Sequence, residues 1–345
     1  MKLLRRNYKL SEIWRLRKKL LKIILNKEKI WNFVLVKISK YLKLKKCLGL
    51  PINILIEPTA DCNYKCLKCP RQYGYVDDGL INGSKDIPFE QYRRVIDEIG
   101  DKLITLRLWH YGEPFLNKNI FRMIEYADKK DIVTAISSNL SLLNKDVSEK
   151  LIDSGLDYLL VSFDGATEET YNNCCQKNMF HTVMDNLEAL LEKRKNKRSE
   201  TPFIELQFVI MDKNEDEMDS IKKIADRLGV DKLSYVMLTP FGCEMPKENK
   251  YRMSLREVSR INFCCLPWEE AIVRYSGIVI PCSMDIQQAH KMGKLFNGAT
   301  GNFRSVWNNA RYRHFREQIA DNINDVDICV NCTKRDNNIH YCVGD

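Results

Sequence analysis

The chain has 345 residues, of which 44% are hydrophobic and 13 are cysteines. This length and composition suit one large domain plus a smaller one, and they exclude a disordered or fibrous protein. The apolar runs are shorter than the ~18 residues of a membrane span, and the N-terminus lacks a signal-peptide pattern. We therefore expect a cytoplasmic protein.

The net charge of +9 is concentrated at the N-terminus. Residues 1–48 contain 16 Lys and Arg but only 2 Asp and Glu, whereas the remainder contains 39 and 44. Apolar residues recur in this segment mostly at helical spacing, which predicts one or two amphipathic helices with a basic polar face. This N-terminal stripe consists of Leu10, Ile13, Trp14, Leu20, Leu21, Ile24, Trp31, Val34, Leu35, Ile38 and Leu42.

Three uses of the N-terminal stripe are open. It could pack on the body of the protein and leave its lysines in solvent. It could instead contact an anionic membrane surface peripherally, with Trp14, Trp31 and Phe33 at the interface. Binding of nucleic acid or of an acidic protein is a third and less favoured alternative.

From residue 52 onward, apolar strands alternate with helices. The predicted strands are 52–58, 103–114, 132–139, 158–165, 203–211 and 232–238, and the predicted helices are 90–100, 119–130, 145–155, 183–197 and 217–229. Such alternation predicts a parallel sheet with crossover helices. Six units are too few for a closed eight-fold barrel, so a partial barrel and an open doubly wound sheet both fit. In either, the chemistry belongs at the carboxyl ends of the strands.

Residues 239–254 show little periodicity and are interpreted as a linker, and a second cysteine-rich region follows them. We therefore expect three parts. These are a basic helical extension at 1–50, the alternating α/β domain at 51–240 and a small cysteine-rich domain at 241–345.

Three cysteines in eight residues, Cys62, Cys66 and Cys69, follow the first predicted strand in the stretch "CNYKCLKC". Disulfides are not expected in a reducing compartment, and structural zinc sites take four ligands. The spacing resembles the signature of the radical SAM (S-adenosylmethionine) superfamily, with an incomplete zinc site as the alternative. The resemblance implies a partial (β/α)6 barrel and a [4Fe–4S] cluster whose open iron binds SAM. It also implies reductive cleavage of SAM to a 5′-deoxyadenosyl radical that abstracts hydrogen from a substrate.

Polar residues at later strand ends fit the same resemblance. "GEP" at 112–114 is similar to the family's GE motif, in which the carboxylate accepts from the SAM ammonium. Residues 208–217 resemble the region that packs on adenine. The residues that the resemblance assigns to SAM are Gly112, Glu113, Pro114, Ser138, Asn139, Ser162 and Asp164. Turn formation and helix capping are the alternative explanation for the polar residues at these ends.

Two positions depart from the family pattern. Lys68 stands where an aromatic residue often precedes the third cysteine. Cys175 occupies the place of an arginine that relatives often carry near the SAM carboxylate, and Lys177 could substitute for it.

Cys265, Cys282, Cys329 and Cys332 form a second set. Together with "CLPW" at 265–268 and "GIVIPC" at 277–282, they resemble a SPASM/twitch module of the shorter, single-cluster type. Four protein ligands would hold a second [4Fe–4S] cluster with no open iron. Such a cluster could accept an electron, which favours a dehydrogenase. A four-cysteine zinc site is the alternative.

The remaining cysteines are Cys47, Cys174, Cys175, Cys243, Cys264 and Cys342, and burial as small hydrophobes is the simplest expectation for them. Cys264 could replace Cys265 as a ligand. A thiol near the site, with Cys175 and Cys243 as candidates beside Cys174, could instead donate a hydrogen atom, as in an epimerase. Asp285 is the candidate base for a substrate radical, although a structural role is also open to it.

These observations together predict a radical SAM oxidoreductase acting on a small hydroxylated substrate, such as a sugar, a cyclitol or a lipid head group. A ribosomal-peptide maturase or epimerase of the SPASM type is the second hypothesis. A non-catalytic metal-binding scaffold at a membrane surface is the third. An external electron donor is expected as a partner, and nucleic acid is not.

Overall fold

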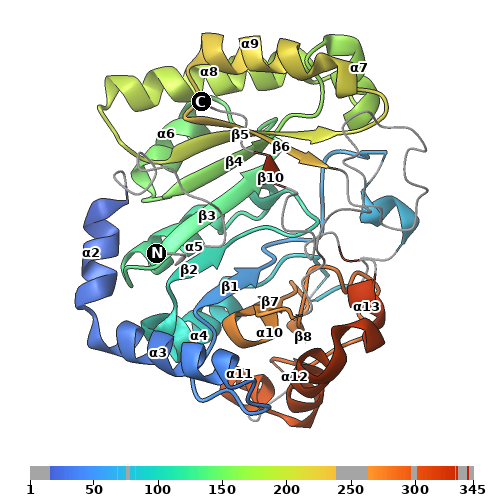
Figure 1. Cartoon of the computed structure of the whole chain (residues 1–345). Coiled ribbons are helices and arrows are strands. Elements are labelled where there is room, and N and C mark those ends of the chain that lie inside the picture. The colour runs from blue at the N-terminus through green and yellow to red at the C-terminus, as the bar shows by residue number, and fades with distance from the viewer. Residues whose placement is uncertain are drawn as a thin grey trace.

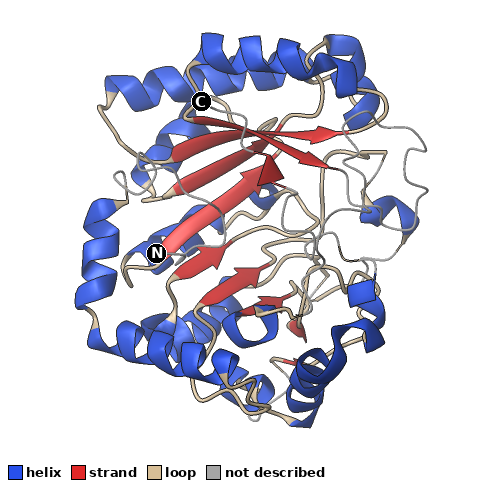
Figure 2. Cartoon of the chain, in the orientation of Figure 1, coloured by secondary structure: helices blue, strands red, loops and turns tan. Residues whose placement is uncertain are grey.

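The computed structural model describes residues 16–67, 69–74, 78–81, 83–237, 263–296, 301–330, 332 and 340–341. Within these residues, ten strands form one sheet in the order β10-β6-β5-β4-β3-β2-β1-β7-β8-β9, and helices surround it (Figure 1, Figure 2). None of the helices in the described part of the chain combines the length and the apolar character needed to cross a bilayer.

The six predicted strands are confirmed and lie parallel to their neighbours. They are β1 (Asn53–Ile56), β2 (Thr105–Arg107), β3 (Val133–Ser138), β4 (Tyr158–Ser162), β5 (Phe203–Ile210) and β6 (Lys232–Met237). The five predicted helices between them are α4 (Phe89–Ile99), α5 (Ile120–Asp128), α6 (Lys145–Asp153), α8 (Phe180–Asn196) and α9 (Met218–Leu228). This arrangement confirms the predicted α/β class and its partial (β/α)6 barrel. One further helix, α7 (Glu168–Cys175), was not predicted because its eight mostly polar residues carry little periodicity.

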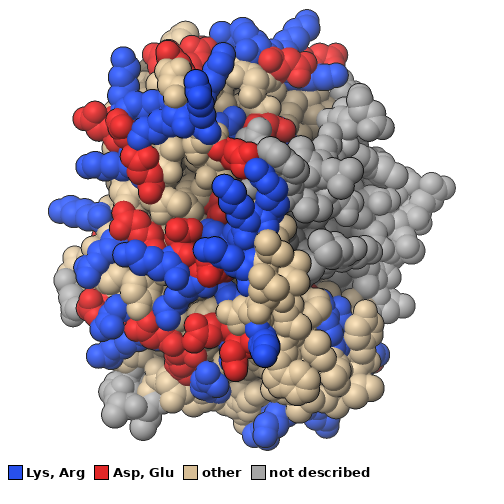
Figure 3. Space-filling model, turned by 90° about the vertical axis from the view of Figure 1, so that its left-hand side faces the viewer, with Lys and Arg blue, Asp and Glu red and all other residues tan. Residues whose placement is uncertain are grey.

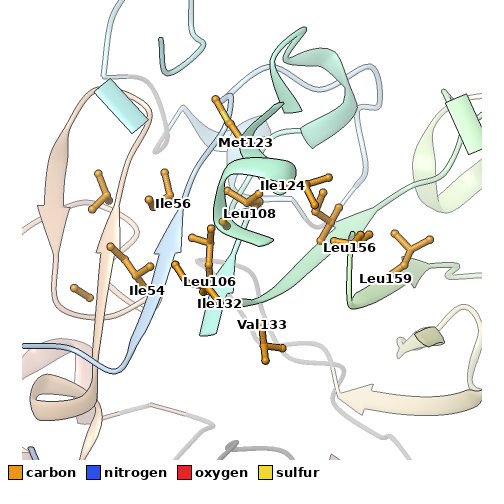
Figure 4. Packing of buried hydrophobic residues seen from close by; sticks show 14 of the residues in the cluster. Ile54, Ile56, Leu106, Leu108, Met123, Ile124, Ile132, Val133, Leu156 and Leu159 are labelled. Carbon is orange, nitrogen blue, oxygen red and sulfur yellow. The ribbon is translucent and has the colours of Figure 1, made fainter. Parts of the chain in front are cut away.

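The core lies between the strands and the helices that cover them. Side chains two residues apart on a strand point to the same face, so Ile54 and Ile56 of β1 meet Leu106 and Leu108 from β2 and the residue just after it (Figure 4). Met123 of α5 belongs to the same buried cluster. Burying each such side chain contributes about 1.5–3 kcal/mol, which fixes the parallel strands and therefore the loops at their carboxyl ends.

The C-terminal region extends this sheet and does not form a sheet of its own. β7 (Glu270–Val273) pairs in parallel with β1, and β8 (Ile278–Ile280) and β9 (Gly293–Lys294) follow in antiparallel order. Beside them lie α10 (Leu266–Glu269), α11 (Phe303–Trp307), α12 (Ala310–Asn322) and α13 (Asp327–Val330) (Figure 1). At the other edge, β10 (His340–Tyr341) pairs with β6. The division into three parts at residues 50 and 240 stays a prediction, and the sheet runs on past the second boundary.

Two helices precede the barrel, α2 (Arg17–Leu25) and α3 (Lys27–Tyr41), as the sequence predicted (Figure 1). Asn26 lies between them, and its side chain accepts from the backbone N–H groups of Glu28 and Lys29. This cap satisfies the donors that the first turn of α3 would otherwise leave unpaired.

The face of α3 that meets the barrel combines the fully buried Val36 with three buried polar side chains. Lys29, Asn32 and Ser39 are all buried. Lys29 Nζ donates to the carbonyl oxygens of Leu103 (2.6 Å) and Asp131 (3.1 Å). These two residues precede β2 and β3, so α3 lies against the amino ends of the strands, opposite the end where the chemistry is expected.

The buried amine of Lys29 gives a stability prediction. Burial lowers its pKa from 10.5 to about 8, so the unfolded chain binds more protons here between those pH values. This group therefore makes the free energy of unfolding rise with pH across that window. We expect the free energy of unfolding, measured by urea denaturation, to rise in wild type relative to Lys29→Met as the pH goes from 8 to 10.5. The control Lys27→Met, at an exposed position of the same helix, should show no such trend, and a pH-independent difference for Lys29→Met would contradict the assignment.

Candidate active site

Cys62, Cys66 and Cys69 lie in the loop that leaves the carboxyl end of β1, as predicted. All three are free, partly exposed thiols. Burial is the largest cause that raises the pKa of each of them. A thiolate at this site therefore needs a nearby positive charge to stabilise it. A bound metal would supply that charge, because metal ligation requires the deprotonated thiol.

The backbone of α7 holds this cysteine loop. The N–H of Lys65 donates to the carbonyl of Cys175 (3.3 Å), and the N–H of Leu67 donates to the carbonyl of Cys174 (3.1 Å). The last residues of α7 thereby use carbonyls that a helix end leaves unpaired. Both cysteines thus have a structural role through their main chain, which the sequence did not indicate.

Gly112 lets the segment after β2 touch the cysteine loop. A Cβ at this position would overlap the carbonyl oxygen of Thr59 and lie 2.7 Å from that of Asp61. The next residue, Glu113, donates its N–H to the same Asp61 oxygen at 2.8 Å. A glycine is therefore required here by close backbone approach, just before Cys62.

The Glu113 carboxylate is buried and is held by its neighbours from β3. It accepts from Ser138 Oγ (2.8 Å), from the N–H of Asn139 (2.8 Å) and from the N–H of Phe115 (3.3 Å). Burial nevertheless raises its pKa to about 7. The Asn139 Nδ2 atom lies 3.9 Å from Cys62 Sγ. The structure thus brings Glu113, Ser138 and Asn139 together beside the first cysteine.

A cavity of about 420 Å³ opens next to the cysteine loop. Its lining residues are Cys66, Leu67, Cys69, Ser162, Asp164, Cys174, Val209, Met211, Asp212 and Lys213. The volume falls within the range of small-molecule and cofactor sites. The stretch expected to pack on adenine, 208–217, supplies four of these residues, so two predicted parts of the site share one cavity.

Asp164 forms the polar floor of this cavity. Its Oδ1 atom accepts from the N–H of Val209 (3.0 Å), and Ser162 Oγ donates to Oδ2 (3.3 Å). Burial raises the pKa of Asp164 to about 6. The carboxylate is thus positioned by β4 and β5 together, at the strand ends where the sequence placed it.

The two candidates for the missing arginine are separated. Cys175 is buried, and its thiol donates to the carbonyl of Lys177 (3.0 Å). Lys177 Nζ donates to the carbonyl of Asn63 (3.2 Å). Neither lines the cavity, whereas Cys174 and Lys213 do. Lys213 was not named as a candidate from the sequence, although it lies within the stretch 208–217 that was expected to pack on adenine.

Cys282 and Cys329 of the second set are connected through the segment that links them. Cys282 follows β8, and its Sγ accepts from the N–H of Met284 (3.4 Å). Cys329 lies in α13. His290 Nε2 pairs with Asp327 Oδ1 (2.6 Å), which ties the segment after Cys282 to that helix.

Cys265 and Cys332 complete the set. Cys265 precedes α10, and Arg316 of α12 donates to the carbonyl of Pro267 (2.9 Å). The N–H of Cys332 donates to the carbonyl of Cys329 (3.3 Å), which places the two one turn apart. The alternative ligand, Cys264, packs against the hydrophobic core. Cys62 and Cys66 pack against the same core, so this contact does not decide between Cys264 and Cys265, and the assignment of Cys265 stays a prediction.

The candidate base Asp285 is buried near Cys282. Its carboxylate accepts from the N–H groups of Ala289 (2.8 Å) and His290 (3.1 Å). It does not belong to the cavity lining described above, and its catalytic role stays a prediction. Cys243, Cys342, Trp14 and Lys68 lie outside the described residues.

A buried network that the sequence did not indicate joins the two cysteine sets. Glu57, directly after β1, accepts from Arg274 Nε (2.6 Å) and from the N–H of Tyr111 (3.3 Å). Tyr111 in turn donates its hydroxyl to the carbonyl of Ser283 (3.4 Å), next to Cys282. The sequence gives one indication of a role for Glu57, namely that a charged residue ends an otherwise apolar strand.

The donor chemistry of the two sets fits iron–sulfur clusters, whose irons take cysteine thiolates as ligands. Among the described residues, no three His, Cys, Asp or Glu side chains converge on one metal ion. Each thiolate of a [4Fe–4S] cluster binds a different iron, so these ligands need not converge on one point. The first set has three cysteines beside a cavity, and the second has four.

Comparison with known proteins agrees with this geometry. A model of the radical SAM superfamily matches residues 56–224, and a model of the iron–sulfur cluster-binding SPASM domain matches residues 264–333. The "Tungsten-containing aldehyde ferredoxin oxidoreductase cofactor-modifying protein" of Pyrococcus furiosus is 21% identical, over 82% of this chain and 87% of that protein. Further curated relatives are covered over about half of their length or less.

Two solved structures share the fold. Streptococcus suis SuiB bound to its precursor peptide SuiA aligns with a TM-score of 0.61 at 13% identity, over 81% of this chain and 69% of SuiB. BtrN in complex with AdoMet and 2-DOIA aligns with a TM-score of 0.50 at 17% identity, over 83% and 94%. The domains imply SAM and a [4Fe–4S] cluster at the first site and additional cluster binding at the second. The chain therefore belongs to the radical SAM superfamily and carries a C-terminal iron–sulfur cluster-binding module of the SPASM type.

Proposed function

We propose that the chain is a radical SAM oxidoreductase that removes two electrons and two protons from a small hydroxylated substrate. Sugars, cyclitols and lipid head groups are the candidate classes. One observation carries the proposal. The Tyr111–Ser283 contact joins the barrel mouth to the residue beside Cys282, so an electron acceptor held by the second set would stand next to the reaction site.

When bound, the reduced cluster and SAM supply a radical able to take hydrogen from carbon. The chain's own residues bind and orient SAM and the substrate. Glu113 would accept the SAM ammonium, while Asp164 and Ser162 would take ribose hydroxyls or substrate. The apolar Val209 and Met211 would cover the adenine and keep water out of the cavity. Lys213 joins Lys177 as a candidate for the SAM carboxylate.

The second set of cysteines favours oxidation over a redox-neutral outcome. With four thiolates and no open iron, a cluster there would accept the second electron without binding the substrate. The proton must go to a base, for which Asp285 stays the candidate. An external electron donor, which has to reduce the first cluster, completes the expected partners. The anionic membrane surface expected at the N-terminal helices is a separate proposal, because it does not depend on the reaction.

Peptide modification is the second candidate. SuiB, which shares the fold, was crystallised with a precursor peptide. Epimerisation has a separate observation in its favour, because Cys174 lines the cavity and could donate a hydrogen atom. A non-catalytic metal scaffold is the third candidate, and it predicts no SAM cleavage.

A substrate panel separates these candidates. Anaerobically reconstituted protein would be incubated with SAM, dithionite and one polyol at a time, including amino sugars, cyclitols and phospholipid head groups. We expect one class to raise 5′-deoxyadenosine above the substrate-free level and to yield a product lighter by two hydrogen atoms. A product that keeps the substrate's mass in H₂O and gains one deuterium in D₂O indicates an epimerase and contradicts oxidation.

The pair Cys264 and Cys265 tests the second site. We expect Cys265→Ser to lose about four of about eight irons per chain, because one donor of that cluster is gone, while SAM is still cleaved. The matched variant Cys264→Ser should keep its iron, because the spacing before Pro267 and Trp268 assigns the ligand role to Cys265. Iron and sulfide assays with absorbance near 400 nm measure both, and iron loss in Cys264→Ser alone would reverse the assignment.

Glu113 gives a pH prediction. With its pKa raised by burial to about 7, the carboxylate form needed by the SAM ammonium accumulates as pH rises. We expect SAM binding by the reconstituted protein to strengthen from pH 6 to 8. Glu113→Gln should bind roughly 10–100-fold more weakly at pH 8 and should lose this component of the pH dependence. Exposed Glu125→Gln is the control, and identical profiles for wild type and Glu113→Gln would contradict the assigned role.

A further inference from the structure

The N-terminal stripe faces solvent over most of its described length. Trp31 is 64% exposed, Ile24 53% and Leu42 66%. The apolar face, as we define it, consists of Leu21, Ile24, Leu25, Trp31, Val34, Ile38, Tyr41 and Leu42, which are all exposed. The apolar face is therefore not packed into the core, whereas Leu20 of the N-terminal stripe does pack against it. Phe33 does pack against the core, and it is therefore not an interfacial residue as expected.

This orientation inverts the usual arrangement of a surface helix. An amphipathic helix normally turns its apolar side to the core, whereas α3 turns Lys29, Asn32 and Ser39 inward. Asn32 is satisfied there, since its amide donates to the carbonyl of Leu50 (2.9 Å) and its oxygen accepts from the N–H of Leu50 (2.8 Å). These inward polar groups, together with the fully buried Val36, hold α3 in place, so its outward apolar face does not serve the packing of this chain.

The surroundings of the apolar face are basic. The exposed lysines are Lys18, Lys22, Lys27, Lys43, Lys45 and Lys46. Two of them form ion pairs with the body of the protein, Lys22 with Asp131 and Lys45 with Glu317. Glu28 is the one acidic residue of segment 16–48, and it pairs with Lys102. Figure 3 shows Lys and Arg side chains intermingled with Asp and Glu side chains on this side of the molecule. A second copy would bring like charges together, whereas an anionic surface would be attracted.

We propose that the apolar face docks on an anionic phospholipid bilayer, with α2 and α3 lying in the plane of the interface. Trp31 and Tyr41 have the amphipathic rings that suit the head-group level. Leu21, Ile24 and Ile38 would enter the acyl boundary, and the lysines would meet the phosphates. This inference does not depend on the reaction proposed above.

The proposal also orients the site. α3 bonds to carbonyls just before β2 and β3, whereas the cysteine loop and the cavity lie at the carboxyl ends of the strands. The mouth therefore opens away from the bilayer on which the apolar face rests. Within the proposed function, this favours a water-soluble sugar or cyclitol over a head group of that same bilayer.

Vesicle flotation of the full chain tests the docking. The vesicles would be phosphatidylcholine alone, or phosphatidylcholine with roughly 30% phosphatidylserine. We expect wild type to float with the anionic vesicles, to float less as salt rises, and to stay behind with neutral ones. Trp31→Ser combined with Ile38→Ser should weaken binding about tenfold or more. Leu80→Ser, which removes an equally exposed apolar side chain near the cysteine loop, should leave binding unchanged.

Folding and other occupants are controlled in the same samples. Because Trp31 and Ile38 are exposed, circular dichroism and iron content should match wild type. Three results would overturn the proposal. These are absence of flotation with anionic vesicles, unchanged flotation of the double variant, and a concentration-dependent dimer that the double variant abolishes. The second would point to residues 1–15 or another surface, and the third to a second copy of this chain.

Discussion

The buried ion pair of Glu57 and Arg274 is the contact on which the arrangement of the two cysteine sets depends. Both side chains are fully buried, and their Nε–Oε2 distance is 2.6 Å. Burial alone would raise the pKa of Glu57, but Arg274 together with His110 lowers it to about 2. Removing one partner of such a pair leaves an uncompensated charge, at a cost of about 3–5 kcal/mol. The pair therefore fixes the turn after β7 against the end of β1, and this holds Cys282 near the barrel mouth.

From that constraint the molecule divides into two ends with different chemistry. At the carboxyl ends of the strands, burial raises the pKa of the cysteine thiols and of Glu113 and Asp164, which prepares a site for a cationic cofactor. At the amino ends, α3 seals the barrel with polar groups and leaves its apolar side outward. The same core separates the two ends, so chemistry at one end and surface contact at the other can be changed independently.

Local patterns were sufficient to predict much of this protein. The six strands follow from alternation, and the meeting of Glu113, Ser138 and Asn139 follows from the rule that parallel strands end at one edge. The pairing of β7 with β1 could not be predicted, because it joins segments over 200 residues apart without any periodic signal. The direction of the N-terminal stripe was also undetermined, since periodicity reveals an apolar face but not what it meets. The buried position of Lys29 decides that question, and a lysine is ordinarily expected in solvent.

The most direct test of the account is the iron and sulfide content per chain after anaerobic reconstitution, measured together with 5′-deoxyadenosine formation on adding SAM and dithionite. The account predicts about eight irons and as many sulfides, as two [4Fe–4S] clusters require, with SAM cleaved. About four irons with cleavage would leave the first cluster and remove the electron acceptor from the proposed oxidation. Zinc in place of iron, with no cleavage, would contradict the account as a whole.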